Sequence, residues 1–86
     1  MKGETVVTEP ITITHSTEAD AQRVWRLALL DDRRPPRGPA LLAYAGGELL
    51  AAVGLLDGRA VADPFRPTAE IVDLLRLRAR HEEVAA

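Results

Sequence analysis

The 86-residue sequence predicts a single α+β domain of the order β-α-β-β-β-α, with a mainly antiparallel sheet and two helices. Two amphipathic stretches, each preceded by a capping signal, enclose the middle of the chain. Between them lie short apolar runs separated by glycine-containing turn signals. Since no internal repeat or linker divides the chain, we expect residues 11–83 to form one domain and residues 1–10 a flexible lead-in.

The first strand and the first helix are predicted in residues 11–30. Residues 11–14 alternate apolar and polar side chains and are all β-branched, which is typical of a half-buried strand. Ser16 or Thr17 then supplies a hydroxyl that can cap a helix, and acidic residues follow in its first turn. Helical spacing predicts a core-facing side made of Ala21, Val24, Trp25 and Ala28.

A proline-rich loop and a hairpin come next. Successive prolines in residues 31–39 remove backbone donors and exclude a helix. The apolar runs 40–44 and 48–56 are separated by Gly46-Gly47, a pair suited to a two-residue hairpin turn. Because the second run is continuously apolar from Leu49, we expect a central strand covered on both faces.

The last strand and the last helix complete the prediction. Asp57-Gly58 indicates a second tight turn that leads into a strand over 59–62. Pro64 and Pro67 then end the sheet, and Thr68 is placed to cap a helix. The predicted core stripe of that helix is Ile71, Val72, Leu75 and Ala79.

Composition excludes several classes of protein. The chain has no cysteine, so neither disulfides nor thiolate metal sites are expected. Its formal net charge of −2 argues against a protein that coats nucleic acid or an anionic membrane. The longest apolar runs are far shorter than the roughly 20 residues that span a bilayer, and no signal peptide is recognised at Met1. A cytoplasmic location is expected.

Residues 11–21 and the hairpin 42–54 resemble the N-terminal half of the GNAT superfamily of N-acetyltransferases. Those proteins open with a strand, a T-x-x-D-A helix start and a hairpin of the form apolar, D/G-G, E-x-V-G. Here the helix start reads TEADA from Thr17, and the hairpin reads GGELLAAVG from Gly46. The resemblance extends over roughly residues 11–80 and implies a GNAT-like fold in a shortened, degenerate member of the superfamily.

In that family, an R/Q-x-x-G-x-G/A loop at a helix N-terminus binds the pyrophosphate of acetyl-CoA through backbone N–H groups. The corresponding cofactor-binding positions are Arg66, Thr68, Ala69, Glu70 and Ile71. Ala69 and Ile71 replace the two glycines, Pro67 removes a donor, and Glu70 places a negative charge where the pyrophosphate would lie. We therefore expect that this loop is inactive and that no cofactor binds.

No catalytic residue is predicted. The family's general base is usually a carboxylate on the fourth strand, but residues 59–62 contain no acid. Asp63, the nearest candidate, precedes Pro64 and is predicted to be a turn residue. The chain ends after the last helix, and we expect that the later strands and the family's tyrosine acid are missing. His15 and His81 lack a second ligand at metal-binding spacing, so no metal site is proposed.

The arginines of the proline-rich loop, Arg33, Arg34 and Arg37, allow more than one interpretation. They are suited to gripping a carboxylate or phosphate, and the neighbouring prolines are suited to presenting a polyproline segment to a partner. A solvated loop balanced by Asp31 and Asp32 is the favoured interpretation.

Two main hypotheses for function follow. The first is a non-catalytic GNAT-like domain, a pseudoenzyme that acts through protein association as a homodimer or with a partner subunit. The alternative is an acyl-CoA-dependent N-acetyltransferase or acyl-CoA binder that a second chain completes, with acetyl-CoA as its cofactor. A regulatory sensor that binds a small ligand in an apolar cleft between strands is compatible with the same residues.

Overall fold

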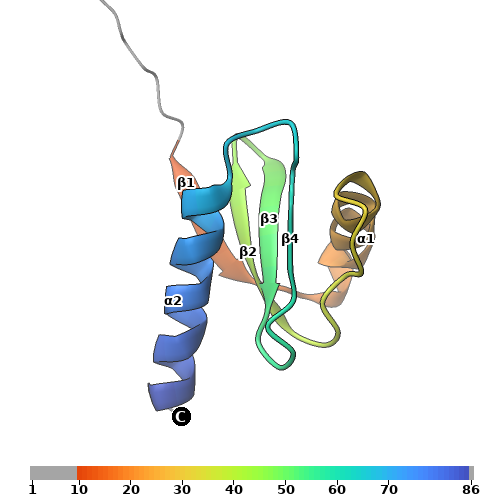
Figure 1. Ribbon diagram of the computed structural model, residues 1–86. Coiled ribbons are helices and arrows are strands. Elements are labelled where there is room, and N and C mark those ends of the chain that lie inside the picture. Colours follow the sequence, from red (N-terminus) through yellow and green to blue (C-terminus); the bar gives the residue numbers. More distant parts are fainter. Residues whose placement is uncertain (1–9, 86) are drawn as a thin grey trace, which may run out of the picture.

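The computed structural model, which describes residues 10–85, shows a four-stranded antiparallel sheet between two helices (Figure 1). In chain order the elements are β1 (Ile11–His15), the 3-10 turn η2 (Glu18–Asp20), α1 (Ala21–Leu30), β2 (Ala40–Ala45), β3 (Glu48–Gly54), β4 (Ala60–Ala62) and α2 (Ala69–Ala85). The strands lie in the sheet in the order β1-β2-β3-β4. The predicted α+β class is confirmed.

The glycine pair between β2 and β3 forms the predicted two-residue turn. Gly46 and Gly47 have φ angles of 58° and 83°, a conformation that residues with a side chain rarely adopt. Positive φ at both positions matches the right-handed twist of the strands on either side. The turn therefore sets the pairing of the central hairpin, in which Ala45 lies opposite Glu48.

The connection between β3 and β4 differs from the prediction. β3 ends at Gly54 and not at Leu56, because the loop that follows folds back on itself. The carboxylate of Asp57 accepts the backbone N–H groups of Arg37 and Arg59, both at 3.0 Å. The Gly54 N–H then donates to the Arg59 carbonyl oxygen at 2.8 Å and closes the loop. Apolar residues alone did not reveal where the strand stops.

The two helices cover opposite faces of the sheet. On one face, α1 buries Val24, Leu27 and Ala28 against side chains of β2, β3 and β4. On the other face, Leu75 of α2 is completely buried among residues of β2 and β3. The predicted stripe of α2 is confirmed, since its other three members pack around the same cluster: Ile71, Val72 and Ala79. The expected covering of β3 on both faces is confirmed as well.

The position predicted for Trp25 is wrong. Its side chain is 55% exposed, whereas Leu27 is 5% exposed and fills the place in the core. The buried stripe of α1 consists of Val24, Leu27 and Ala28, so it is rotated away from Ala21 and Trp25. Because α1 carries apolar residues around much of its circumference, helical spacing alone allowed two neighbouring stripes.

A β-bulge in β3 changes which residues share a face. Ala43 lies opposite Ala51, but Tyr44 lies opposite Leu49, so Leu50 is an extra residue in β3. The bulge brings Leu49 to the same face as Tyr44, and both pack against the core cluster under α1. Tyr44 shares the α1 side of β2 with Ala40 and Leu42, and its hydroxyl reaches the start of α1.

Candidate functional site

The outer edge of β1 is a candidate surface for strand pairing. The Ser16 N–H donates to the Ala40 carbonyl oxygen at 2.8 Å, and the register pairs Thr14 with Leu42 and Thr12 with Tyr44. Hydrogen-bonded pairs alternate along an antiparallel ladder, so these residues turn their backbone groups toward β2. The backbone N–H and C=O groups of Ile11, Ile13 and His15 therefore point away from the sheet.

Apolar side chains flank this edge. Ile11 is 39% exposed at one end of β1. Arg76 and Arg80 of α2 line a hollow together with residues of the β3–β4 loop. These two arginines therefore lie on the side of α2 that faces β4. Leu74 lies roughly opposite Arg76 on the helical wheel, on the β1 side, and is 41% exposed. At the far end of β1, His15 Nε2 lies 2.9 Å from the carboxylate of Glu82 in α2.

The residues at the family's cofactor-loop position lie around the start of α2. Ala69 is the first residue of the helix, and Glu70 is exposed in its first turn. Ile71 is partly buried against the core cluster of Leu75, so it serves the packing of the helix on the sheet. Glu70 remains as a negative charge at the helix N-terminus, where a bound phosphate would need positive potential.

The other residues of this junction have structural partners. Arg66 Nη1 lies 3.2 Å from the Glu48 carboxylate, at the β2–β3 end of the sheet. The Thr68 carbonyl oxygen accepts the Val72 N–H at 2.9 Å and begins the helical ladder. Asp63 accepts the Phe65 N–H through Oδ1 at 2.9 Å, which confirms its predicted role in a turn.

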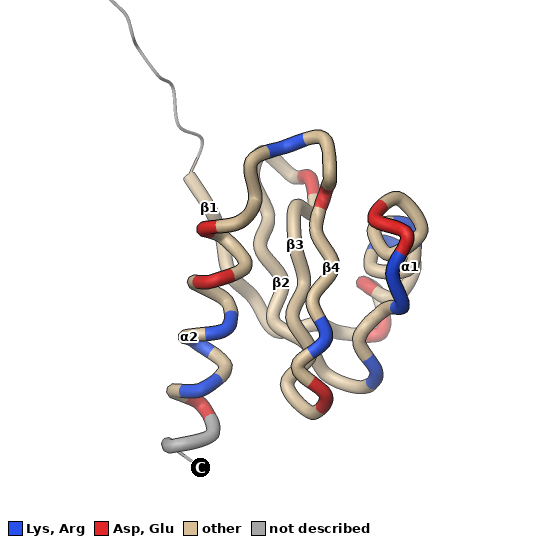
Figure 2. The backbone as a smooth tube through the Cα atoms, in the orientation of Figure 1, with Lys and Arg blue, Asp and Glu red and all other residues tan. Residues whose placement is uncertain are grey.

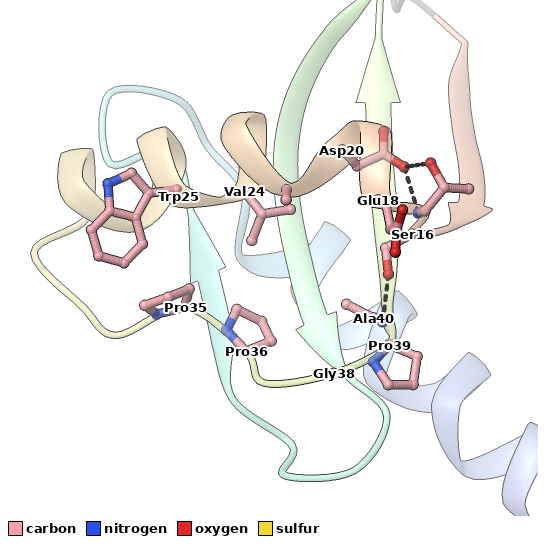
Figure 3. Close-up of a pocket in the computed structure, with 12 residues that line it drawn as sticks. Ser16, Glu18, Asp20, Val24, Trp25, Pro35, Pro36, Gly38, Pro39 and Ala40 are labelled. Carbon is pink, nitrogen blue, oxygen red and sulfur yellow. Dashed lines mark hydrogen bonds between the residues drawn. The ribbon is translucent and has the colours of Figure 1, made fainter.

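A groove of about 570 Å³ lies between α1 and the proline-rich loop (Figure 3). Trp25 faces Pro35 and Pro36 at one end, whereas Ser16 and Glu18 line the other end. The sequence hypothesis of a small-ligand sensor placed its cleft between strands, but this groove lies between a helix and a loop. Its acidic end is formed largely by the 3-10 turn η2, whose capping box includes Thr17 and Asp20.

Asp20 and Thr17 form a capping box at the 3-10 turn η2, which leads directly into α1. The carboxylate of Asp20 accepts the Thr17 N–H at 2.7 Å, and Thr17 Oγ1 accepts the Ala19 N–H at 3.2 Å. Of the two predicted capping residues, Thr17 therefore takes the role, while the Ser16 hydroxyl accepts the Ala40 N–H at 2.9 Å. The Tyr44 hydroxyl donates to Asp20 Oδ1 at 2.9 Å and ties β2 to this cap.

Hydrogen bonding and burial together set the protonation of Asp20 and Tyr44. The pKa of Asp20 is lowered, first by the backbone N–H of Thr17 and then by the Tyr44 hydroxyl. The pKa of Tyr44 is raised, first by burial and then by the adjacent Asp20. Both shifts favour a charged Asp20 that accepts the hydrogen bond and a neutral Tyr44 that donates it. The hydrogen bond between them therefore stabilises the fold, which is a structural role.

The histidines do not form a metal site in the part of the chain that the structure describes. His15 is exposed, as predicted, and its contact with Glu82 joins β1 to α2. His81 is exposed on α2. Within residues 10–85, no group of three or more potential metal ligands comes together.

The arginines of the proline-rich loop are partly balanced as predicted. Arg33 Nε lies 3.4 Å from Asp31 Oδ2, and the same carboxylate oxygen accepts the Ala62 N–H of β4 at 3.0 Å. Two features of this region escaped the sequence analysis. Asp31 reaches the edge of the sheet, and Arg59 and Arg76 lie beside the loop arginines. No local sequence pattern indicates either feature, because the residues that come together are far apart in the chain.

Comparison with protein-family models, with curated proteins and with solved structures found no significant match. Among the described residues, neither helix combines the length and the apolar character needed to cross a bilayer.

Proposed function

We propose that the chain is a non-catalytic, GNAT-like protein-association domain that forms a homodimer through the outer edges of β1. The observation that carries this proposal is the row of outward backbone groups on Ile11, Ile13 and His15. No hydrogen-bond partner for them occurs among the described residues. An open strand edge of this kind is a template for pairing with another chain.

The residues of β1 fit a two-fold arrangement. In an antiparallel pair centred on Ile13, the Ile13 residues of the two copies lie opposite each other, and Ile11 of each copy lies opposite His15 of the other. All of these residues present outward backbone groups, so the pairing forms about six hydrogen bonds. It joins the two four-stranded sheets into one continuous sheet and brings the exposed Ile11 and Leu74 near the junction.

A scaffold role agrees better than catalysis with the residues at the start of α2. Pro67 offers no backbone donor, Glu70 contributes a negative charge, and Ile71 is occupied by core packing. β4 contains only Ala60, Val61 and Ala62, so the strand that carries the family's general base has no carboxylate. These features support a pseudoenzyme and argue against the alternative of an acyl-CoA-dependent transferase.

The mass of the full chain in solution tests the dimer. Light scattering at micromolar concentration should give twice the 9.3 kDa of one chain. Ile11→Pro removes an outward N–H and leaves the ladder to β2 in place, so we expect the mass of a single chain with the fold retained. Ile11→Thr keeps the N–H and should remain dimeric. A wild-type mass of one chain would contradict the proposal.

Acetyl-CoA titration tests the enzyme alternative separately. A ligand at a hundred times its dissociation constant stabilises a protein by about 2.7 kcal/mol, which raises the melting temperature of a domain this small by roughly ten degrees. We expect no shift at millimolar acetyl-CoA. A shift of that size would revive the acyl-CoA binder and would leave the result on oligomeric mass unaffected.

A further inference from the structure

Four arginines from distant parts of the chain converge beside the start of β4. They line a hollow of about 520 Å³ together with Gly58 and Ala60: Arg33, Arg34, Arg59 and Arg76. Figure 2 shows basic segments in the loop after α1, at the start of β4 and along α2. None of the residues that line this hollow is acidic, although the whole chain has a formal net charge of −2.

The nearby carboxylates neutralise only part of this charge. Arg33 lies 3.4 Å from Asp31 and Arg59 lies 3.8 Å from Asp57. Both carboxylates also accept backbone N–H groups, which fixes them outside the hollow. Arg34 and Arg76 have no ion pair within the part of the chain that the structure describes. Among the described residues, the charges of Arg34 and Arg76 are therefore left for a ligand.

The hollow continues along the open edge of β4. The Asp63 N–H donates to the Leu50 carbonyl oxygen, and the Gly54 N–H donates to the Arg59 carbonyl oxygen. Because hydrogen-bonded pairs alternate along the ladder, the backbone groups of Val61 point toward β3 and those of Ala60 point away from it. A second hollow of about 330 Å³ runs beside Ala60, Val61 and Ala62 and shares Arg33 and Arg76 with the first. Asp31 and Asp73 also line this second hollow, so the excess of positive charge lies in the first. The side chains of the two alanines are small enough to let a peptide backbone approach.

We propose that this groove binds an extended, acidic segment of a partner protein, which adds a strand to β4 and places carboxylates among the four arginines. Backbone pairing with Ala60 supplies position, and Arg34 and Arg76 supply charge-assisted hydrogen bonds that select acidic side chains. Asp31 already occupies the Ala62 N–H, so the added strand pairs at the Ala60 end of the edge. No aromatic side chain lines either hollow, which disfavours stacking of nucleic-acid bases.

Peptide binding to the full chain tests this inference. The probe is a blocked peptide of alternating threonine and valine with two glutamates at each end, and the control probe carries lysines instead. Arg34→Glu and Arg76→Glu should each weaken binding of the acidic peptide by about tenfold or more. The matched control is Arg78→Glu, because Arg78 is exposed on the same helix but lines neither hollow, and it should change the affinity by less than about twofold.

A second readout on the wild-type chain reports on the backbone. Hydrogen exchange of the Ala60 amide should slow when the acidic peptide is bound. Equal binding of the lysine peptide, an equal loss in Arg78→Glu, or unchanged exchange at Ala60 would each overturn the inference. Binding of inorganic phosphate without binding of the acidic peptide would also overturn it, in favour of a small-anion site.

Discussion

The two edges of the sheet are built differently. β1 has five residues, and none of the described residues bonds to its outward backbone groups. β4 has three residues, its Ala62 N–H is taken by Asp31, and arginines surround its start. Short length and nearby charge are known means of preventing indiscriminate strand pairing. This difference is the basis of the two proposals above, a second copy of the chain at β1 and an acidic partner at β4.

The largest expected effect comes from a substitution that disturbs only the β4 side. In Gly54→Ala, the new Cβ would overlap Asp57 Oδ1 and lie 3.0 Å from Pro36 Cβ. Asp57 would have to move, and the N–H groups of Arg37 and Arg59 would lose their acceptor. We expect a loss of about 1–3 kcal/mol in the free energy of unfolding, measured with urea.

Hydrogen exchange in Gly54→Ala shows where the loss occurs. Protection should fall in β4 and the loop before it, while the amides of β1 that bond to β2 keep theirs. An equal loss of protection at both edges would mean that the two edges are not independent.

A smaller effect is expected when the carboxylate that covers part of the β4 edge is removed. Asp31→Ala leaves the Ala62 N–H without its acceptor and should cost about 1 kcal/mol of stability. It also opens the edge, so light scattering should show species larger than those of the wild type. Asp31→Asn keeps an acceptor oxygen and serves as the control. Identical masses for all three proteins would show that Asp31 does not protect this edge.

The smallest effect is expected from acid. The pKa of Asp20 is lowered by the Thr17 N–H and the Tyr44 hydroxyl, and that of Asp57 by the N–H groups of Arg59 and Arg37. Each folded-state pKa lies below the ordinary value of 3.8, so the folded protein binds fewer protons than the unfolded chain at pH values just below 3.8. The stabilisation is therefore complete above about pH 4 and is lost as the pH falls through the folded-state values.

Asparagine variants separate the two carboxylates. The melting temperature of Asp20→Asn should fall less between pH 4 and pH 2 than that of the wild type, because the variant lacks the titrating carboxylate at the β1–α1 junction. Asp57→Asn should behave in the same way, because it lacks the titrating carboxylate of the β3–β4 loop. A wild-type melting temperature that stays constant over this range would contradict the assignment of both carboxylates.

Local signals predicted much of the fold. Gly46-Gly47 specified the central hairpin, and the stripe around Leu75 specified the buried side of α2, because each depends on neighbours in the chain. The bulge at Leu50 was not predictable, since a continuously apolar strand has no alternation in which an extra residue would show. Trp25 was misplaced for a related reason, because apolar residues surround much of α1.

The candidate sites were harder to predict than the elements that form them. The edge of β1 is open because β1 is the outermost strand in the order of the sheet. The residue pattern of one strand does not reveal its place in that order. The arginine hollow combines arginines from the loop after α1, the β3–β4 loop and α2. The contact between Asp31 and Ala62 joins residues 31 positions apart. Such sites arise only when the topology brings the segments together.

The exposed position of Trp25 has a practical consequence for spectroscopy. It is the only tryptophan in the chain, and it is 55% exposed where it lines the groove with Pro35 and Pro36. We therefore expect its fluorescence emission before unfolding to lie near that of a solvated indole and to change little on denaturation. The same residue is a natural optical probe of the groove, because any molecule that covers the indole there shifts its emission toward shorter wavelengths.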